Sequence, residues 1–548
     1  MKTRRIVQIA TILSLPGLLF AGCTTSDPGG TVSSDAPPAT VVIALSQELN
    51  TIDPTAAIDS NSSSAINQVY EGLYRLDANN SPVPAGAAAL PEVSADGLTY
   101  TISLNQAAKW SDGTPVKAAD YEWAWKRAVG LDSAAENEVY YGFVLNASDI
   151  IAGNKPVDEL GIKALDDYTL EIKLAAPTTF FASLLASVSF FPLNEAYVTS
   201  QGDKFGSDSE HAIYNGPFVL ADYAGPGVGT DWKYVKNPTY WDAASVKLDS
   251  IEVRVIKETS TAVNLYTSGE VDQVAISGAQ VQALRNDPGF TAYTTATAAF
   301  LGYNFNIPAF ANVKVRQAIS LVIDRAALVN NVLNDGSALA TGLVPAGLSS
   351  DQTRGDFATA AGNPLETDVD KAKTLWAEAK QELGIDKLEI DLQTFDSDRM
   401  RTVTQYLQNV IQENLVGTTV TITASPVANF LENTKSGSFG IYLVTWGADY
   451  ADASSLLDLA RSNSGSNWGH YSSPEFDAAF AAAQGADAAD SAARFDDLLQ
   501  AHAILLADQG YTPVYFQSST LLRNPEFKGV VFHSAGSNTE YKTAYIER

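Results

Sequence analysis

The sequence predicts a mixed α/β protein with more than one domain. Its 548 residues exceed what a single hydrophobic core normally organises, and a hydrophobic content of 45% is typical of folded chains. Segments that alternate apolar and polar residues, such as 251–255 and 388–392, are interspersed with stretches of helical periodicity, such as 369–383 and 401–415. This alternation indicates helices packed on a sheet.

The N-terminal 22 residues are interpreted as an export signal. Positive charges in residues 1–5 precede a mostly apolar stretch, residues 6–20, that is too short and too interrupted to span a membrane. Cys23, the single cysteine, follows two small residues, and this junction resembles the lipobox of bacterial lipoproteins, in which the cysteine is lipidated. The alternative is a secreted protein in which Cys23 has no role. Residues 23–39, rich in small and polar side chains, are expected to form a flexible tether.

The composition argues against several classes of function. There are 63 acidic and 35 basic residues, a net charge of −28, and no cluster of Lys or Arg that could hold a nucleic acid. The four histidines form no His-Glu-x-x-His pair, and neither a Gly-x-Ser-x-Gly elbow nor a phosphate-binding loop occurs. We therefore expect no enzyme, no cofactor and no metal site.

Taken in order, the first elements are a buried strand at 41–45 and a helix that follows the polar residues 59–64. Ser60 and Asn61 in that polar stretch are interpreted as loop residues whose backbone is free to meet a ligand, or else as the cap of the helix. Later, residues 440–444 form an uncharged, β-branched and aromatic stretch typical of a buried strand. The alanine-rich residues 474–509 predict two helices with a break near Gly485.

The stretch after the strand at 440–444 carries the clearest chemical signal. It reads Thr-Trp-Gly-Ala-Asp-Tyr over residues 445–450, so that Asp449 stands between two aromatic residues at the carboxyl end of a buried strand. A carboxylate in such a place needs a cationic or hydrogen-bonding partner. The partner is either a ligand or a local turn that the carboxylate caps.

Further short motifs occur along almost the whole chain after the leader. They include Tyr-Glu-Gly-Leu-Tyr at 70–74, Lys-Trp-Ser-Asp-Gly-Thr-Pro-Val at 109–116, Tyr-Asn-Gly-Pro-Phe at 214–218 and Asn-Pro-Thr-Tyr-Trp-Asp at 237–242. In this order, and with the motif at 446–450, they resemble the extracytoplasmic solute-binding proteins of peptide ABC importers, the oligopeptide- and dipeptide-binding family.

The resemblance implies a two-lobed periplasmic-binding-protein-like α/β fold, with a hinge and an extra subdomain inserted in the terminal lobe. We expect the terminal lobe at 40–70, 197–297 and 516–548, the inserted subdomain at 71–196 and the second lobe at 298–515. The implied function is capture of oligopeptides between the lobes and delivery to the ABC permease, by a monomer held on the outer face of the membrane through lipid on Cys23. Alternatives are a non-peptide ligand on the same fold, namely an oligosaccharide, metal chelate or haem, and a peptide-sensing surface receptor without transport.

In peptide-binding members of this family, the aspartate of the Trp-x-Ala-Asp-Tyr motif binds the peptide ammonium, so the resemblance assigns that role to Asp449. The backbone of Gly447 and Ala448 would pair with the peptide as an added strand does. Trp446 would wall a side-chain pocket or simply pack between strands, and Tyr450 is assigned to the same site.

Two further assignments lie outside the motif. Arg399 is a candidate partner for the peptide carboxylate, with a solvated helix start as the alternative. The aromatic residue that closes over the ligand in relatives has no counterpart in residues 133–137, so the nearby Tyr140 is assigned to the cleft, with Tyr141 beside it.

Overall fold

The computed structural model describes residues 39–57, 59–77, 80–130, 138–226, 228, 230–351, 353–535, 537 and 539–547. The predictions made for the export signal, for Cys23 and for most of the tether fall outside the described residues, as does the stretch at 133–137.

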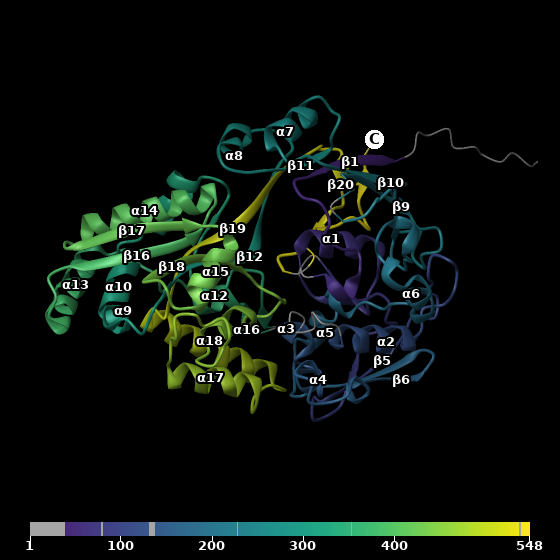
Figure 1. Ribbon diagram of the computed structural model, residues 1–548, viewed down its shortest axis with the longest axis horizontal. Helices are drawn as coiled ribbons and strands as arrows, with labels where there is room; N and C mark the ends of the chain where they lie inside the picture. The colour runs from purple at the N-terminus through teal and green to yellow at the C-terminus, as the bar shows by residue number, and fades with distance from the viewer. Residues whose placement is uncertain are drawn as a thin grey trace, which may run out of the picture. The chain divides into compact units, whose positions relative to one another are not determined.

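The described residues form an 11-stranded mixed sheet that organises two lobes (Figure 1). The strand order is β17-β16-β18-β12-β19-β11-β1-β10-β9-β8, and β13 pairs with β19 outside this path. The bounds, in the same order, are Thr418–Ser425, Leu388–Phe395, Ile441–Gly447, Phe290–Tyr303, Tyr511–Arg523, Gln273–Ile276, Thr40–Leu45, Ser250–Val255, Asp231–Lys236 and Phe218–Ala221, with β13 at Ala338–Leu339. We call the part built on β8, β9, β10, β1 and β11 the terminal lobe, and the part built on β18, β16 and β17 the second lobe. The predicted two-lobed α/β fold is confirmed.

Strands β12 and β19 belong to both lobes. β12 pairs with β18 of the second lobe along residues 297–303, and β19 pairs with β11 of the terminal lobe along residues 520–523. The antiparallel ladder between them shifts register between Thr294 and Ala298. Both lobes are therefore joined by two hydrogen-bonded strands with an irregularity partway along them.

The second lobe has a core on each face of its sheet, because side chains along a strand alternate between faces. Ala299, Leu301 and Tyr303 of β12 belong to one core, together with α10 (Val313–Leu321), α13 (Val369–Leu383) and α14 (Asp398–Asn414). Ala298 and Phe300 belong to the other core, with α17 (Pro474–Gln484) and α18 (Ser491–Asp508). Helices thus cover both faces of the sheet, as Figure 1 shows.

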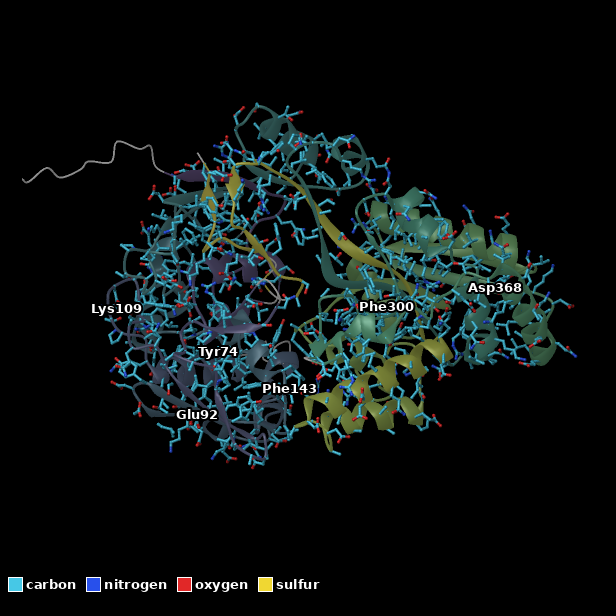
Figure 2. All side chains as sticks on the ribbon, turned by 180° about the vertical axis from the view of Figure 1, so that it is seen from behind. Tyr74, Glu92, Lys109, Phe143, Phe300 and Asp368 are labelled. Atoms are coloured by element: carbon cyan, nitrogen blue, oxygen red, sulfur yellow. The ribbon has the colours of Figure 1, made fainter. Side chains whose placement is uncertain are left out.

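The terminal lobe has a small core around β11, which includes Ala262 and Val274, and a larger core, which includes Tyr74 and extends into residues 87–193. Those residues contribute α2 (Ala118–Val129) and a small antiparallel sheet in the order β4-β5-β7-β6, with bounds Glu92–Val93, Thr99–Ser103, Thr169–Lys173 and Ile162–Asp166. Figure 2 labels Tyr74 in this core and Phe300 in the core of the second lobe. Elements of this lobe that border the cleft include α1 (Ser60–Val69), α5 (Phe181–Leu184) and α7 (Thr259–Thr267).

Local sequence accounts for most element bounds, and one interpretation is corrected. The helix predicted at 401–415 begins earlier, at Asp398, because the Ser397 side chain caps it by accepting from the Met400 N–H. The break near Gly485 between α17 and α18 is confirmed. Ser60 and Asn61 are not loop residues: they form the first turn of α1, and the cap is Asp59, whose Oδ1 accepts from two backbone N–H groups.

Candidate functional site

The candidate site begins where β18 ends. Pairing between β18 and β16 is confined to Ile441 and Tyr442, so beyond them the edge of β18 away from β12 has no strand beside it in the described part of the chain. The Ala448 N–H donates to the Ala296 carbonyl at 2.7 Å, and the Asp449 N–H donates to Ser455 Oγ at 2.8 Å. These bonds hold the backbone while the Asp449 carboxylate has no partner among the described residues.

Two neighbouring carboxylates differ sharply in their surroundings. Burial raises the pKa of Asp449 to about 6, and the negative charge of Asp458 adds to the effect. Asp452 is more deeply buried, but Arg494 holds it with two hydrogen bonds of 2.7 and 2.9 Å, and its pKa is lowered despite the burial. Asp452 is therefore a satisfied structural group, whereas no cation among the described residues pairs with Asp449, although its buried position calls for one.

A cavity of about 350 Å³ lies against Asp449 and is lined from both lobes. Gly447 and Ala448 line it from the second lobe, and Ser60 and Tyr140 line it from the terminal lobe. The rest of the lining is mostly small and polar: Ala57, Asp59, Ser63, Ser187, Val188, Ser189, Thr295, Thr297, Gln517, Ser519, Ser534, Ala535 and Ser537. These described lining residues include two carboxylates and no Lys, Arg or His, so the cavity favours a positively charged group.

A larger cavity of about 1090 Å³ continues from the first, since Gln517 and Ser519 line both. Arg399 lies in this larger cavity and forms an ion pair with Asp335, with 2.8 Å between Nη2 and Oδ2. Arg399 is therefore at the cleft, but it already has a carboxylate partner. A role in binding the distal carboxylate of a ligand stays a prediction.

The predicted aromatic residues have separate surroundings. Tyr450 stacks on Phe180 at 4.7 Å between ring centroids and meets Phe143, labelled in Figure 2, edge-on at 5.8 Å, which ties the second lobe to the terminal lobe. Trp446 packs against Trp468 at 5.6 Å and does not line either of the two cavities described above. The Asn61 side chain donates to Gln47 Oε1 and is likewise outside their linings.

Tyr140 fits the site best of the predicted aromatic residues. It lines the cavity beside Asp449, and burial, with the Asp449 charge as a smaller cause, raises its pKa to about 12. Its hydroxyl therefore stays protonated and can donate a hydrogen bond at neutral pH.

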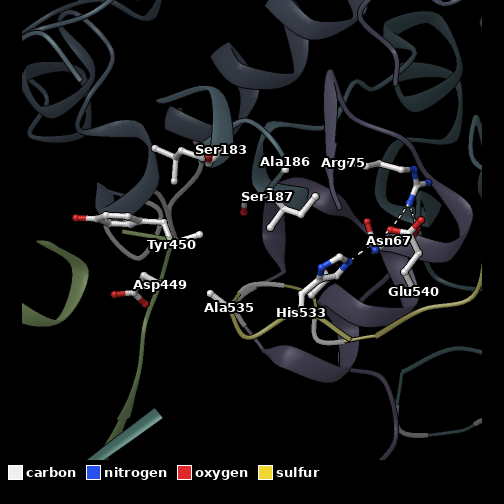
Figure 3. Close-up of a pocket in the computed structure, with 14 residues that line it drawn as sticks. Asn67, Arg75, Ser183, Ala186, Ser187, Asp449, Tyr450, His533, Ala535 and Glu540 are labelled. Atoms are coloured by element: carbon white, nitrogen blue, oxygen red, sulfur yellow. Dashed lines mark hydrogen bonds and ion pairs between the residues drawn. The ribbon is translucent and has the colours of Figure 1, made fainter. Parts of the chain in front are cut away.

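A third, smaller cavity also borders Asp449 (Figure 3). Its far side holds the buried residues Arg75, His533 and Glu540. Sequence reasoning missed these residues, and nothing local marks them. It also missed the polar run at 517–520 within the otherwise apolar β19, a pattern that could have indicated a strand facing the cleft.

Within the described ranges, no group of three or more His, Cys, Asp and Glu side chains is placed to hold a metal ion. None of the described helices combines the length and hydropathy needed to cross a bilayer.

Comparison with known proteins gives the family. The model described as "Bacterial extracellular solute-binding proteins, family 5 Middle" matches residues 81–468. The chain belongs to this family. It is 33% identical to the dipeptide-binding protein of Lactococcus lactis subsp. cremoris (strain MG1363) over 100% of both chains. The family is described as one of extracellular solute-binding proteins, and a relative from Escherichia coli (strain K12), 29% identical over 98% of this chain and 99% of its own, is named a periplasmic oligopeptide-binding protein.

Solved structures agree with this assignment. The peptide-bound OppA of Listeria monocytogenes is 34% identical, with a TM-score of 0.76 and coverage of 94% of this chain and 100% of that one. The unliganded open form of the murein tripeptide-binding protein MppA is 25% identical, with a TM-score of 0.79 and coverage of 93% and 98%. The predicted family is confirmed.

Proposed function

We propose that the chain captures peptides with a free amino terminus in the cleft between its lobes and delivers them to the permease of an ABC importer. One observation carries this: Asp449 is a half-buried carboxylate without a partner in the described structure, and it faces a cavity without basic residues. The names of the relatives, which are dipeptide- and oligopeptide-binding proteins, support the same ligand class.

The ligand's ammonium would pair with Asp449, and its backbone would continue along the unpaired edge of β18 at Gly447 and Ala448. The cavity lining comes from both lobes, so a bound peptide touches both and stabilises the closed arrangement. We place the hinge where β12 and β19 shift register, near the expected lobe boundaries at residues 298 and 516.

The protein acts as a monomer that is anchored to the outer face of the cell membrane through lipid on Cys23. Metabolic labelling with a fatty-acid analogue tests the anchor: label should enter the wild-type protein and should be lost in Cys23→Ser. Equal labelling of both proteins would contradict it.

An oligosaccharide ligand is less well supported. Sugars need aromatic faces open to the cleft, but Tyr141 is 0% exposed and Trp468 is 8% exposed, and neither lines the cavities at Asp449. Among the described residues that line the 350 Å³ cavity beside Asp449, the aromatic one is Tyr140.

The test is calorimetric titration of ligand-free protein with short peptides and with their N-acetylated counterparts. Acetylation and Asp449→Ala should each weaken binding by about 2–5 kcal/mol, because each removes one member of a buried charge pair. Asp386→Asn is the matched control, since Asp386 is exposed and lies on the turn before β16. Unchanged affinity in Asp449→Ala, or equal binding of acetylated peptides, would exclude Asp449 as the anchor.

A further inference from the structure

We propose that the small cavity beside Asp449 receives the first side chain of the bound peptide and favours a short side chain that ends in a hydrogen-bond donor, namely Ser, Thr or Asn, which binds Nδ1 of His533. This inference rests on the proposed function, because it takes the ammonium of the ligand to lie at Asp449.

The small cavity lies next to the place proposed for the peptide ammonium. Asp449, Ser187, Ala535 and Ser537 line both this cavity and the 350 Å³ cavity in which the peptide is placed. In a peptide the α-ammonium and the first side chain branch from the same carbon atom. An ammonium held at Asp449 therefore brings that side chain to the mouth of the smaller cavity.

The volume of the small cavity limits the size of the side chain that it can receive. Its volume is about 40 Å³, and a cavity needs roughly 10–15 Å³ for each water molecule it holds. A few water-sized groups fit, which is enough for a hydroxyl with a methyl group or for a carboxamide. The apolar walls, Leu76, Leu184, Ala186 and Tyr450, leave no space for an aromatic ring.

His533 supplies a hydrogen-bonding atom that has no partner in the described structure. It lines this cavity, is 3% exposed, and its Nδ1 is buried without a hydrogen-bond partner in the described structure. Figure 3 shows its ring between Ala535 and Glu540. A buried polar atom without a partner destabilises the protein, so a ligand group that pairs with Nδ1 recovers that cost.

The other ring nitrogen decides which kind of group fits. Nε2 of His533 lies 3.6 Å from Oε2 of Glu540, and Nη1 of Arg75 lies 3.3 Å from the same oxygen. Burial opposes ionisation of Glu540, but Arg75 and His533 outweigh it and hold its pKa at about 2. The ionised carboxylate only accepts, so the tautomer with its proton on Nε2 is the one that faces it favourably, and in that tautomer Nδ1 presents a lone pair.

The charges around the small cavity disfavour a basic or acidic first side chain. A Lys or Arg side chain would bring a second cation toward Arg75, which is 5% exposed and already balanced by Glu71 and Glu540. An acidic side chain would lie between Asp449 and Glu540. Neutral donors satisfy His533 without placing a further charge in the cavity.

The experiment compares tripeptides X-Ala-Ala with a free amino terminus by calorimetry. Thr and Val have the same shape and differ in one hydroxyl group, so their ratio isolates the hydrogen bond. We expect Thr to bind about tenfold more tightly than Val, Asn more tightly than Asp, and Phe more weakly than Ala. In His533→Phe the Thr and Val peptides should bind equally.

His470→Asn is the matched control, because His470 is exposed, lies in the second lobe, and has a φ of 60° that Asn tolerates. It should keep the wild-type ratio. If His533→Phe does not fold, the ratio in the wild-type protein alone decides.

Equal binding of Thr and Val by the wild-type protein would overturn the proposal, as would a ratio that survives in His533→Phe. Tighter binding of Asp than Asn would overturn the assignment of Nδ1 as an acceptor. In each case Ala-Ala-Ala still reports on the proposed function, because its binding depends on Asp449 and does not depend on the small cavity.

Discussion

Replacing Asp449 with Asn should stabilise the unliganded protein while it weakens peptide binding. Burial and the Asp458 charge raise the pKa of Asp449 from its ordinary 3.8 to about 6. This change in pKa corresponds to about 3 kcal/mol, which is an upper value because the side chain keeps some contact with solvent. Asn removes the buried negative charge and with it this cost.

The effect has a defined pH dependence. Between about pH 4 and pH 6 the folded protein holds the Asp449 proton more tightly than the unfolded chain does, so the ionised carboxylate destabilises the fold as the pH rises through this range. The cost is complete above about pH 6 and absent below about pH 4. Asp449→Asn should therefore gain stability at pH 7.5 and gain none at pH 4.

Thermal unfolding of ligand-free protein at the two pH values measures this. Asp452→Asn is the informative contrast, because it breaks a buried ion pair with Arg494 and should destabilise the protein by about 3–5 kcal/mol. The reasoning fails if Asp449→Asn unfolds at the wild-type temperature at pH 7.5, or if its gain persists at pH 4.

Two other substitutions test packing. Gly302→Ala should destabilise the second lobe by at least about 1–3 kcal/mol, because the added Cβ would overlap the Tyr442 ring. Urea unfolding measures this as a lowered midpoint with an unchanged slope, and an unchanged midpoint would contradict it. Tyr450→Ala removes a stack on Phe180 that is worth about 0.5–1.5 kcal/mol, so the unliganded lobes should separate more readily. Small-angle scattering should show a larger radius of gyration in that variant, and an unchanged radius would rule out the contact as a restraint.

Periodicity and caps were enough to predict much of the fold. The helix at 369–383 and the break near Gly485 follow from local spacing, and both are present. The first turn of α1 was misplaced because Asp59, Ser60 and Asn61 are all good capping residues, and sequence alone does not decide which of them caps.

The site was predictable only where its signal is local. Asp449 stands out because a charge follows an apolar strand. By contrast, Arg399 is paired with Asp335, and His533 faces Glu540. These contacts form between segments that carry no recognisable motif and meet only in the folded chain. Their sequence spacing therefore does not predict them.

The sharing of β12 and β19 sets a limit on dissection of the protein. A fragment cut at either lobe boundary would lose the partner of a central strand and expose a long row of unpaired backbone groups, which promotes aggregation. The terminal lobe also draws β1, β11 and the end of β19 from distant parts of the chain. Neither lobe is therefore expected to fold on its own. A binding assay with one isolated lobe would measure a misfolded fragment and not the native site.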